Sequence, residues 1–371
     1  MSKILVKFED KIIGTLFLTK EKKIMFKYSS EWLENGFSLN PFKLPLSDKV
    51  FVATTNYFDG LFGVFADSLP DSWGNLLLDR MLRAHGVDRS RITVLDRLSF
   101  IGDNGMGALS YEPVKNIELT NNELTLDEIN EECKNILMSK ECLNLDEMYK
   151  LGGSSGGARP KILINYEGKP WIVKFSNTLD SKDSGIIEYE YFRCARECGI
   201  NVPNTKLFSS NICSGYFGIE RFDVSNGKRV HMVSVAGLLE IDYRAPSLDY
   251  IELIKLTKIL TNDIDTYEMY RRMCFNVFSH NLDDHSKNFS FLYNSDKKCW
   301  ELSPTYDLTY SNTYFGEHTT SVNGKGIDIS IDDLLQVGIK NKLDKDICLS
   351  IITEVKECVE EKLGNIIKKL K

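Results

Sequence analysis

The feature of this sequence that most constrains its fold is a glycine-rich run followed at once by two short apolar segments. The run occupies residues 152–157, and the apolar segments are 161–165 and 171–175. Residues 166–170 between them contain Gly and Pro, which is typical of the turn of a β-hairpin. A Walker A loop is excluded, because Ile162 stands where that loop requires Ser or Thr and a strand follows instead of a helix.

Glycines let backbone amides approach phosphate oxygens closely, and protein kinases place such a loop ahead of a strand. On its own, a flexible linker of Gly and Ser explains the run equally well. The sequence downstream therefore has to decide between the two interpretations.

A lysine inside an apolar strand is the second signal. Lys174 lies between Val173 and Phe175, and a buried ammonium is costly unless it is paired. In kinases such a lysine contacts nucleotide phosphates and a glutamate of the next helix. Glu188 can supply that partner, whereas Glu190 ranks second because it faces another side of the helix. For an isolated lysine, a side chain that reaches solvent from an edge strand is the simpler interpretation.

The polar segment 280–288 is the third signal. Asp283 and Asn288 are five residues apart, which is the offset between the base and a metal-binding residue in a kinase catalytic loop, and Asp307 follows 19 residues later. Asp283 would accept the proton of a substrate hydroxyl, while the oxygen ligands Asn288 and Asp307 would hold Mg²⁺. Lys287 would neutralise charge on the transferred phosphoryl group.

Two other interpretations suit this segment. His280, Asp283, Asp284 and His285 would also suit a divalent-metal hydrolase, and a solvated loop beside a helix is the simplest alternative. Neither explains the glycine-rich run or Lys174 upstream. The four elements in this order favour ATP-dependent phosphoryl transfer.

The organisation of the chain predicts an α+β, bilobal, protein-kinase-like fold with a β-rich N-terminal lobe and an all-helical C-terminal lobe. Short strands at 3–8, 11–18 and 23–28, a helix with Asp71 at its N-cap, and helical periodicity over 116–151 support this division. The expected domains are a β-rich subdomain at 1–113, connecting helices and the kinase N-lobe at 114–223, and a helical C-lobe at 224–371.

Composition narrows the class further. A chain of 371 residues with 42% apolar residues can bury two cores, and it has neither a membrane-length apolar run nor a signal-peptide core. Nine cysteines are sparse and odd in number, so we expect reduced thiols in a soluble, cytoplasmic protein. Cys194 and Cys198 lie four apart without a second Cys or His pair at zinc spacing, which favours packing. A net charge of −7 argues against broad nonspecific nucleic-acid binding.

Taken together, these residues resemble the HipA family of toxin kinases, over nearly the whole chain. The catalytic pattern of that family corresponds to Asn281, Asp283, His285 and Lys287–Asn288, its metal segment to 302–308, and its phosphate loop to Ser154 through Lys161. Further matches lie in the N-terminal part, at 69–71 and 101–109.

The resemblance implies a Mg²⁺-ATP-dependent serine/threonine protein kinase with catalytic Asp283 and Lys287 and metal ligands Asn288 and Asp307. Glu220 and Phe222 would hold adenine through their backbone. The cofactor-binding set is Gly153, Ser154, Ser155, Gly156, Gly157, Lys161, Lys174, Glu188, Glu220, Phe222 and His285. Family members switch themselves off by phosphorylating a loop serine; Ser154 matches that position, and the additional Ser155 is a second candidate.

The resemblance also implies partners. They are a helix-turn-helix antitoxin of HipB type, operator DNA contacted only through that antitoxin, and an aminoacyl-tRNA synthetase as protein substrate. No membrane partner is expected. A catalytically idle, antitoxin-bound co-repressor and a small-molecule phosphotransferase are the alternatives.

Overall fold

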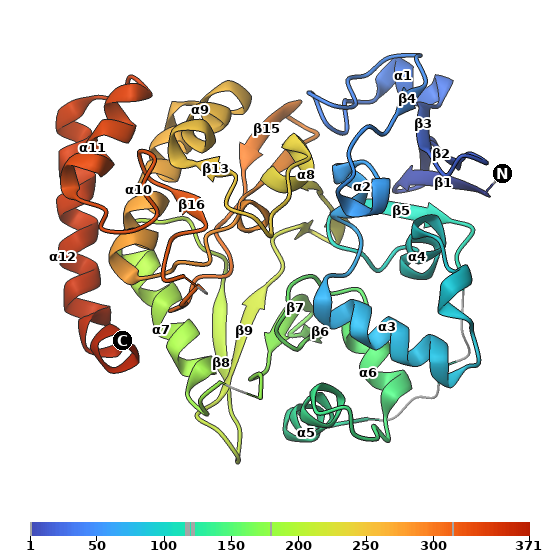
Figure 1. The fold of residues 1–371 in the computed structure, drawn as a ribbon, viewed down its shortest axis with the longest axis horizontal. Helices are drawn as coiled ribbons and strands as arrows, with labels where there is room; N and C mark the ends of the chain where they lie inside the picture. Colours follow the sequence, from blue (N-terminus) through green and yellow to red (C-terminus); the bar gives the residue numbers. More distant parts are fainter. Residues whose placement is uncertain (1, 116–118, 120–122, 179, 314) are drawn as a thin grey trace. The chain divides into compact units, whose positions relative to one another are not determined.

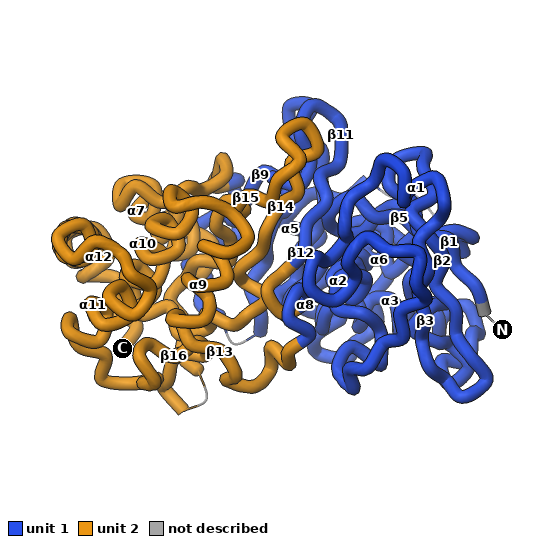
Figure 2. Tube along the Cα trace, turned by 90° about the horizontal axis from the view of Figure 1, so that it is seen from above, with its two compact units in different colours: residues 1–183, 208–233, 237–240 blue, residues 184–207, 234–236, 241–371 orange. Residues whose placement is uncertain are grey.

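The computed structural model describes residues 2–115, 119, 123–178, 180–313 and 315–371, which divide into two compact units (Figures 1 and 2). Unit 1 comprises the residues up to 183 together with 208–233 and 237–240. Unit 2 comprises 184–207, 234–236 and 241–371. Because neither unit is continuous in sequence, the predicted division into three consecutive domains stays a prediction.

The N-terminal part of unit 1 is an antiparallel sheet with the strand order β4-β3-β2-β1-β5. Its strands are β1 (Ser2–Phe8), β2 (Lys11–Leu18), β3 (Ile24–Tyr28), β4 (Phe51–Val52) and β5 (Leu109–Glu112). Side chains with period-two alternation, such as Ile4 and Val6, are buried on one face of the sheet. The three strands predicted at the N-terminus are therefore confirmed.

Four α-helices accompany this sheet among the described residues: α1 (Ser30–Asn35), α2 (Gly63–Ala66), α3 (Ser72–Ala84) and α4 (Val94–Ile101). The predicted helix after Asp71 is α3, which buries Trp73 and Leu77 on its apolar face. Helix α4 begins with a capping box in which Thr93 and Asp96 bond reciprocally.

The second sheet of unit 1 pairs β6 (Lys161–Tyr166) with β7 (Lys169–Lys174), and β7 with β9 (Tyr216–Glu220), all antiparallel. The predicted hairpin is confirmed with a tighter turn than 166–170, because Glu167 and Gly168 both have positive φ, 53° and 76°. A two-residue turn of that kind matches the twist of the two strands.

Helices α5 (Leu126–Leu137) and α6 (Leu145–Gly152) form the predicted helical segment, whose residues 116–118 and 120–122 lie outside the described part. They share one core with α3 and the second sheet. That core contains Trp73, Leu77, Ile129, Cys133, Ile136, Met148, Ile162, Trp171, Val173, Phe175, Phe208 and Tyr216. Helix α3, from the N-terminal part of the chain, thus packs in one core with the sheet that follows the glycine-rich run.

Unit 2 is built on the helices α7 (Ser184–Glu197), α9 (Tyr250–Leu260), α10 (Asp263–Ser279), α11 (Ile331–Lys340) and α12 (Lys345–Leu370). Helix α7 ends, as predicted, just before Gly199, whose φ is +76°. Helix α10 packs against α9 and α12, and α12 also contacts α7 and α11 (Figure 1). No helix of the described residues is both long and apolar enough to cross a membrane.

The C-terminal half is not wholly helical, which corrects the predicted all-helical lobe. Strands β14 (Ser290–Asn294) and β15 (Cys299–Leu302) form an antiparallel hairpin, and β13 (Leu248–Asp249) pairs in parallel with β16 (Thr320–Ser321). The aromatic pair Tyr293 and Trp300 stands across the hairpin with ring centroids 5.4 Å apart, and such pairs stabilise strands. The remaining short elements are β8 (Thr205–Phe208), β10 (Val224–Ser225), β11 (Lys228–Arg229), β12 (His231–Ser234) and α8 (Val235–Leu239).

Candidate active site

The glycine-rich loop follows directly on α6 and lies against the first turn of α3. A Cβ atom on Gly74 of α3 would stand 2.8 Å from the carbonyl oxygen of Ser155 and 2.9 Å from that of Gly153. The Trp73 indole donates a hydrogen bond to the Lys161 carbonyl at 3.1 Å. Only a glycine at position 74 lets the loop approach α3 this closely, so α3 fixes where the loop runs.

Asp71 holds the loop by its side chain. It occupies the predicted N-cap position of α3, but its carboxylate makes no capping hydrogen bond to the helix. Instead, Oδ2 accepts the backbone N–H of Gly157 at 2.9 Å. The prediction that Asp71 is the N-cap residue of this helix is confirmed, while its carboxylate binds a loop amide distant in sequence.

The two candidate serines of the loop differ in environment. Ser155 is 2% exposed, and its hydroxyl donates to the Gly152 carbonyl at 2.6 Å. Ser154 is half-buried. The Ser155 hydroxyl is thus engaged inside the loop, while part of Ser154 reaches the surface.

The side chains of Lys161 and Lys174 project from the same face of the β6–β7 hairpin. Lys161 and Lys174 are direct partners in the antiparallel pairing of β6 and β7, and directly opposed residues project from the same side of a sheet. Lys161 is 8% exposed, and its Nζ lies so close to the loop that a Cβ on Gly157 would come within 2.6 Å of it. The Nζ of Lys174 stands 5.7 Å from the centroid of the Phe217 ring. This pair of cations beside loop amides suits a phosphate chain.

The segment after β9 contains the expected adenine-binding residues Glu220 and Phe222. The Glu220 carboxylate pairs with the Lys169 ammonium at 2.9 Å, which leaves the backbone of this segment to make any contact with a base. Asp223 is fully buried, binds the Arg221 guanidinium at 2.7 Å and accepts the N–H of Gly107 at 2.7 Å. The loop after α4 therefore anchors this segment, as α3 anchors the glycine-rich loop.

The two glutamates proposed as partners of Lys174 lie on α7 in unit 2. Glu188 is 2% exposed. Glu190 is bound to the Arg193 guanidinium by two hydrogen bonds of 3.0 Å. Glu190 thus has a partner on its own helix, and the pairing of Glu188 with Lys174 stays a prediction.

The polar loop 281–288 of unit 2 begins where α10 ends at His280, which has a left-handed φ of 58°. The Asn281 amide donates to Asn276 Oδ1 at 3.0 Å and accepts from the Ser311 hydroxyl at 3.1 Å. Ser311 in turn accepts the N–H of Asp283 at 2.9 Å. These bonds fix the backbone of the loop immediately before the expected base.

Four of the predicted residues come together in this loop. The Asp283 side chain is 60% exposed, and the imidazole Nε2 of His285 lies 4.0 Å from its Oδ1. The Asn288 amide donates to the Asp283 carbonyl at 2.7 Å. The Lys287 ammonium stands 4.8 Å from the centroid of the Tyr243 ring. The carboxylate, the imidazole, the ammonium and the amide are therefore presented by one short stretch of chain.

Asp307 is joined to the same loop through its neighbour. The Tyr306 hydroxyl donates to the Lys287 carbonyl at 2.7 Å. Asp307 itself adopts a φ of 58°, a conformation that costs a non-glycine residue about 1–3 kcal/mol and that gathers at functional sites. Because the Asn288 amide nitrogen is committed to Asp283, its Oδ1 faces away from that bond. An amide oxygen and a carboxylate are hard donors of the kind that Mg²⁺ takes, so the residues present fit this ion.

The hydrolase alternative does not fit this geometry. The His280 Nε2 lies 3.2 Å from Asn312 Oδ1. Asp284 is 1% exposed, and its carboxylate accepts from the Tyr250 hydroxyl and from His318 Nδ1, each at 2.9 Å. Throughout the part of the chain that the structure describes, no three His, Asp or Glu side chains gather here as a metal site.

Three residues that sequence reasoning missed support the site. Tyr306 and Ser311 fix the loop and the segment of Asp307, and the ring of Tyr243 packs against that of His285 in a T-shaped arrangement, at a centroid distance of 5.5 Å. Tyr306 directly precedes Asp307, which was a usable signal. For Ser311 and Tyr243 the sequence offers none, since both act through contacts distant along the chain.

Comparison with known proteins gives matches along most of the chain. Residues 4–112 match the HipA N-terminal domain, and residues 153–363 match the HipA-like C-terminal domain. A protein of Sinorhizobium fredii described as a kinase, Y4dM, is 29% identical over 52% of this chain and 50% of its own length. The serine/threonine-protein kinase toxin HipA of Shewanella oneidensis is 26% identical over 82% of this chain and 74% of its own. This chain therefore spans about half the length of the first of these relatives.

A solved structure has the same fold. It is the complex of HipA, HipB and operator DNA from Shewanella oneidensis, with a TM-score of 0.73, 20% identity, and coverage of 98% of this chain and 90% of that one. The predicted α+β, kinase-like fold class is confirmed by this likeness.

Proposed function

The chain belongs to the HipA family, and we propose that it is a Mg²⁺-ATP-dependent serine/threonine protein kinase. The observation that carries this proposal is the joining of Asp283, Asn288 and the segment of Asp307 in unit 2, through the Asn288–Asp283 and Tyr306–Lys287 hydrogen bonds. Phosphoryl transfer to a hydroxyl requires a carboxylate base and oxygen ligands for a cation, and these segments contain residues of both kinds.

The proposed role of each residue follows from its exposure and its chemical type. Asp283, the most exposed of these groups, takes the proton of the substrate hydroxyl, and Lys287 stabilises charge on the phosphoryl group. Asn288 and Asp307 hold Mg²⁺, which neutralises the phosphates when it is bound. His285 lies beside Asp283 and contributes to nucleotide binding.

In unit 1, the amides of Gly153 to Gly157 and the ammonium groups of Lys161 and Lys174 bind phosphate oxygens. Glu220 and Phe222 bind adenine through the backbone that the loop after α4 anchors.

We further propose that the protein phosphorylates its own loop, on Ser154. The half-buried position of Ser154 supports this choice, because the Ser155 hydroxyl is buried and bonded to Gly152. A dianion on the loop repels the phosphates of ATP and disturbs the contact with Asp71. Phosphorylation at this point therefore inactivates the kinase.

As to partners, we propose that the protein is the toxin of a toxin-antitoxin pair in the bacterial cytoplasm. The solved relative is a complex with HipB and operator DNA, which supports a helix-turn-helix antitoxin of HipB type and DNA contact through it. The proposed substrate is an aminoacyl-tRNA synthetase, whose phosphorylation would stop translation and growth.

The test is transfer of the γ-phosphate of radiolabelled ATP with Mg²⁺ to a cell lysate, to purified synthetases and to the kinase itself. We expect labelled protein bands with the wild type and strongly reduced labelling with Asp283→Asn. Label on a low-mass metabolite would instead indicate a small-molecule phosphotransferase. Tight operator binding with the antitoxin, without labelling or growth arrest, would indicate an idle co-repressor.

A further inference from the structure

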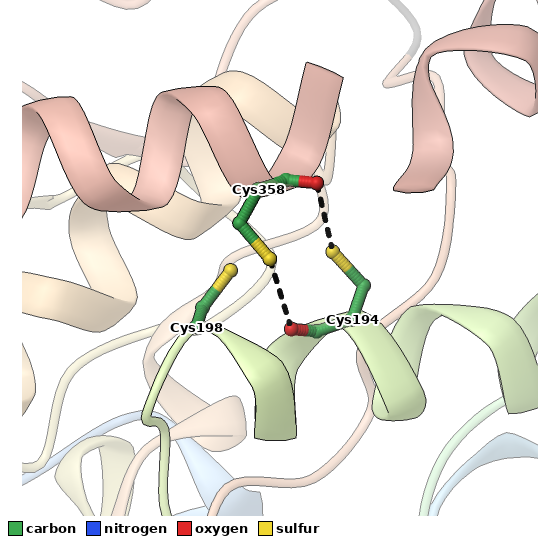
Figure 3. Close-up of side chains that lie close together, drawn as sticks. All are labelled: Cys194, Cys198 and Cys358. Atoms are coloured by element: carbon green, nitrogen blue, oxygen red, sulfur yellow. Dashed lines mark hydrogen bonds between the residues drawn. The ribbon is translucent and has the colours of Figure 1, made fainter. Parts of the chain in front are cut away.

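Three cysteine side chains of unit 2 converge between two helices (Figure 3). Cys194 lies on α7, Cys198 directly follows the end of α7, and Cys358 lies on α12. All three Sγ atoms lie within 4.8 Å of one another. Cys358 is 164 residues away from Cys194 in the sequence, so the spacing of Cys194 and Cys198 alone could not reveal this group.

Packing alone does not account for the convergence. A buried cysteine usually acts as a small apolar side chain, and Cys194 and Cys198 are indeed 1% and 3% exposed. Here, however, three sulfur atoms lie within 4.8 Å of one another, and two of them make only long contacts to backbone carbonyls. Cys194 Sγ approaches the Cys358 carbonyl and Cys358 Sγ approaches the Cys194 carbonyl, each at 3.9 Å (Figure 3). Contacts of that length are weak and easily exchanged for stronger ones.

The geometry fits a cation held by sulfur. Bonds of about 2.3 Å from a cation to thiolates place the sulfur atoms roughly 3.8–4.0 Å apart, so small rotations of the side chains suffice. Thiolates select soft cations such as Cu⁺ and Zn²⁺. Structural zinc sites almost always have four ligands, and among the described residues no His, Asp or Glu joins the three sulfurs. A cation that accepts three ligands is therefore favoured over zinc.

A positive charge stands beside the cluster. The Arg271 guanidinium donates to the Cys198 carbonyl at 2.9 Å and to the Glu354 carboxylate at 3.0 Å. The pKa of Cys198 is raised, by its hydrogen bond with Cys194 and by burial, while Arg271 acts in the opposite direction. Burial also raises the pKa of Cys358 to about 11. The thiols of Cys198 and Cys358 thus stay protonated until a cation displaces their protons, and Arg271 favours the thiolate form of Cys198.

We propose that Cys194, Cys198 and Cys358 form a binding site for Cu⁺, which ties α7 to α12. Each thiol that becomes a ligand releases one proton to solvent, and neither copper nor sulfur changes oxidation state. The site connects two segments far apart in the sequence, one of which carries Glu188. This proposal is independent of the kinase activity.

The experiment is a titration of the full-length, reduced protein with Cu⁺ under anaerobic conditions, against a chromophoric Cu⁺ chelator. We expect one tightly bound Cu⁺ per chain. Replacing Cys358 by Ser should weaken binding by more than about tenfold, since even loss of a group that merely orients a ligand costs that much. The matched control is Cys299→Ser, which removes an exposed cysteine outside the cluster and should leave binding unchanged.

Folding is checked by thermal unfolding of the same proteins. Cys358 is half-buried, so Ser at this position should fold, and Cys194→Ala provides a second variant. Cu⁺ should raise the midpoint for the wild type and for Cys299→Ser, but not for the cluster variants. Equal Cu⁺ affinity of wild type and Cys358→Ser would overturn the proposal. Retention of Zn²⁺ in preference to Cu⁺ would overturn the choice of cation.

Discussion

The carboxylate of Asp71 and the backbone N–H of Gly157, 86 residues apart in sequence, are joined by a hydrogen bond of 2.9 Å. The bond runs from the start of α3 to the glycine-rich loop. Hydrogen bonds to charged groups stabilise by about 1.5–3 kcal/mol, enough to hold one loop conformation over others. The residues 69–71 that resemble the family pattern thus have a structural role in the proposed phosphate site.

We predict that Asp71→Ala weakens ATP binding. Loss of the acceptor frees the Gly157 amide and lets the loop leave α3, and a loss of about 1.4 kcal/mol corresponds to a tenfold higher dissociation constant for ATP. Calorimetric titration with ATP would measure it. Asp48→Ala, at an exposed aspartate, is the control. An unchanged dissociation constant in the Asp71 variant would mean that the loop is held without this bond.

Gly157 offers a sharper test, because the structure supplies a matched control. Gly157 and Gly168 have positive φ of 84° and 76°, but a Cβ on Gly157 would meet Lys161 Nζ at 2.6 Å while one on Gly168 would meet nothing within 4 Å. Both alanine variants should lose about 1 kcal/mol of unfolding free energy from backbone strain. Only Gly157→Ala should lose ATP binding. Similar ATP affinities for the two variants would exclude a phosphate-binding role for the loop.

Local patterns in the sequence predicted most elements of both units. Period-two alternation gave the N-terminal strands, and glycines gave the ends of the hairpin and of α7, because these signals are contained in a few neighbouring residues. The hairpin β14–β15 was missed for the opposite reason. Its strands are short and lie among strongly helical segments, and the contact between Tyr293 and Trp300 that stabilises them is visible only once they pair.

The candidate site shows the same division. Asp283 and Asn288 were predicted from the offset that a kinase catalytic loop requires, and Asp307 from its place downstream; their roles stay predictions. Ser311 and Cys358 have partners far along the chain, and no local pattern marks them. Asp71 was predicted only as an N-cap, and its bond to the Gly157 amide was not. Asp284 resembles a catalytic residue in the sequence as much as Asp283 does. The two differ in burial, because Asp284 is 1% exposed while the Asp283 side chain is 60% exposed.

Substituting Asp283 and Asp284 separately should distinguish a catalytic aspartate from a structural one. Asp283→Asn, at a side chain that is 60% exposed, should leave the unfolding free energy within about 0.5 kcal/mol and reduce phosphoryl transfer by a factor of about 10²–10⁴. Asp284→Asn should cost about 1–3 kcal/mol, because Tyr250 and His318 lose a buried charged acceptor. Urea unfolding and a radiolabel assay on both variants would measure this; a reversed pattern would contradict the assignment of the base.

The two loop serines, Ser154 and Ser155, should differ in whether they are phosphorylated. After incubation with Mg²⁺-ATP, we expect intact-mass spectrometry to show one added phosphate on the wild type and on Ser155→Ala, and none on Ser154→Ala. Ser155→Ala should instead lose about 1 kcal/mol of stability with its bond to Gly152. Phosphate that persists in Ser154→Ala and maps to Ser155 would show that the loop must open before it is modified.

A buried histidine gives unit 1 a pH-dependent stability. His231 is 1% exposed, and the ring nitrogen Nε2 lies 2.9 Å from the Leu39 carbonyl, to which it donates as N–H. Burial lowers the pKa of His231 from 6.5 to about 4. The folded protein therefore keeps this ring neutral at pH values where the unfolded chain already binds a proton.

The direction of this pH dependence follows from which state, folded or unfolded, binds the proton. Above pH 6.5 both states are neutral at this residue, and the full stability is present; between pH 6.5 and about 4 only the unfolded state gains the proton, so stability falls as pH falls. The loss of unfolding free energy from this group reaches about 3 kcal/mol, since each pKa unit corresponds to 1.36 kcal/mol. His231→Gln keeps a donor for Leu39 and cannot titrate. We expect urea unfolding from pH 7.5 to pH 4 to show the wild type losing about 3 kcal/mol more than this variant. Parallel losses in the two proteins would mean that carboxylates elsewhere dominate, and that His231 is solvated before unfolding.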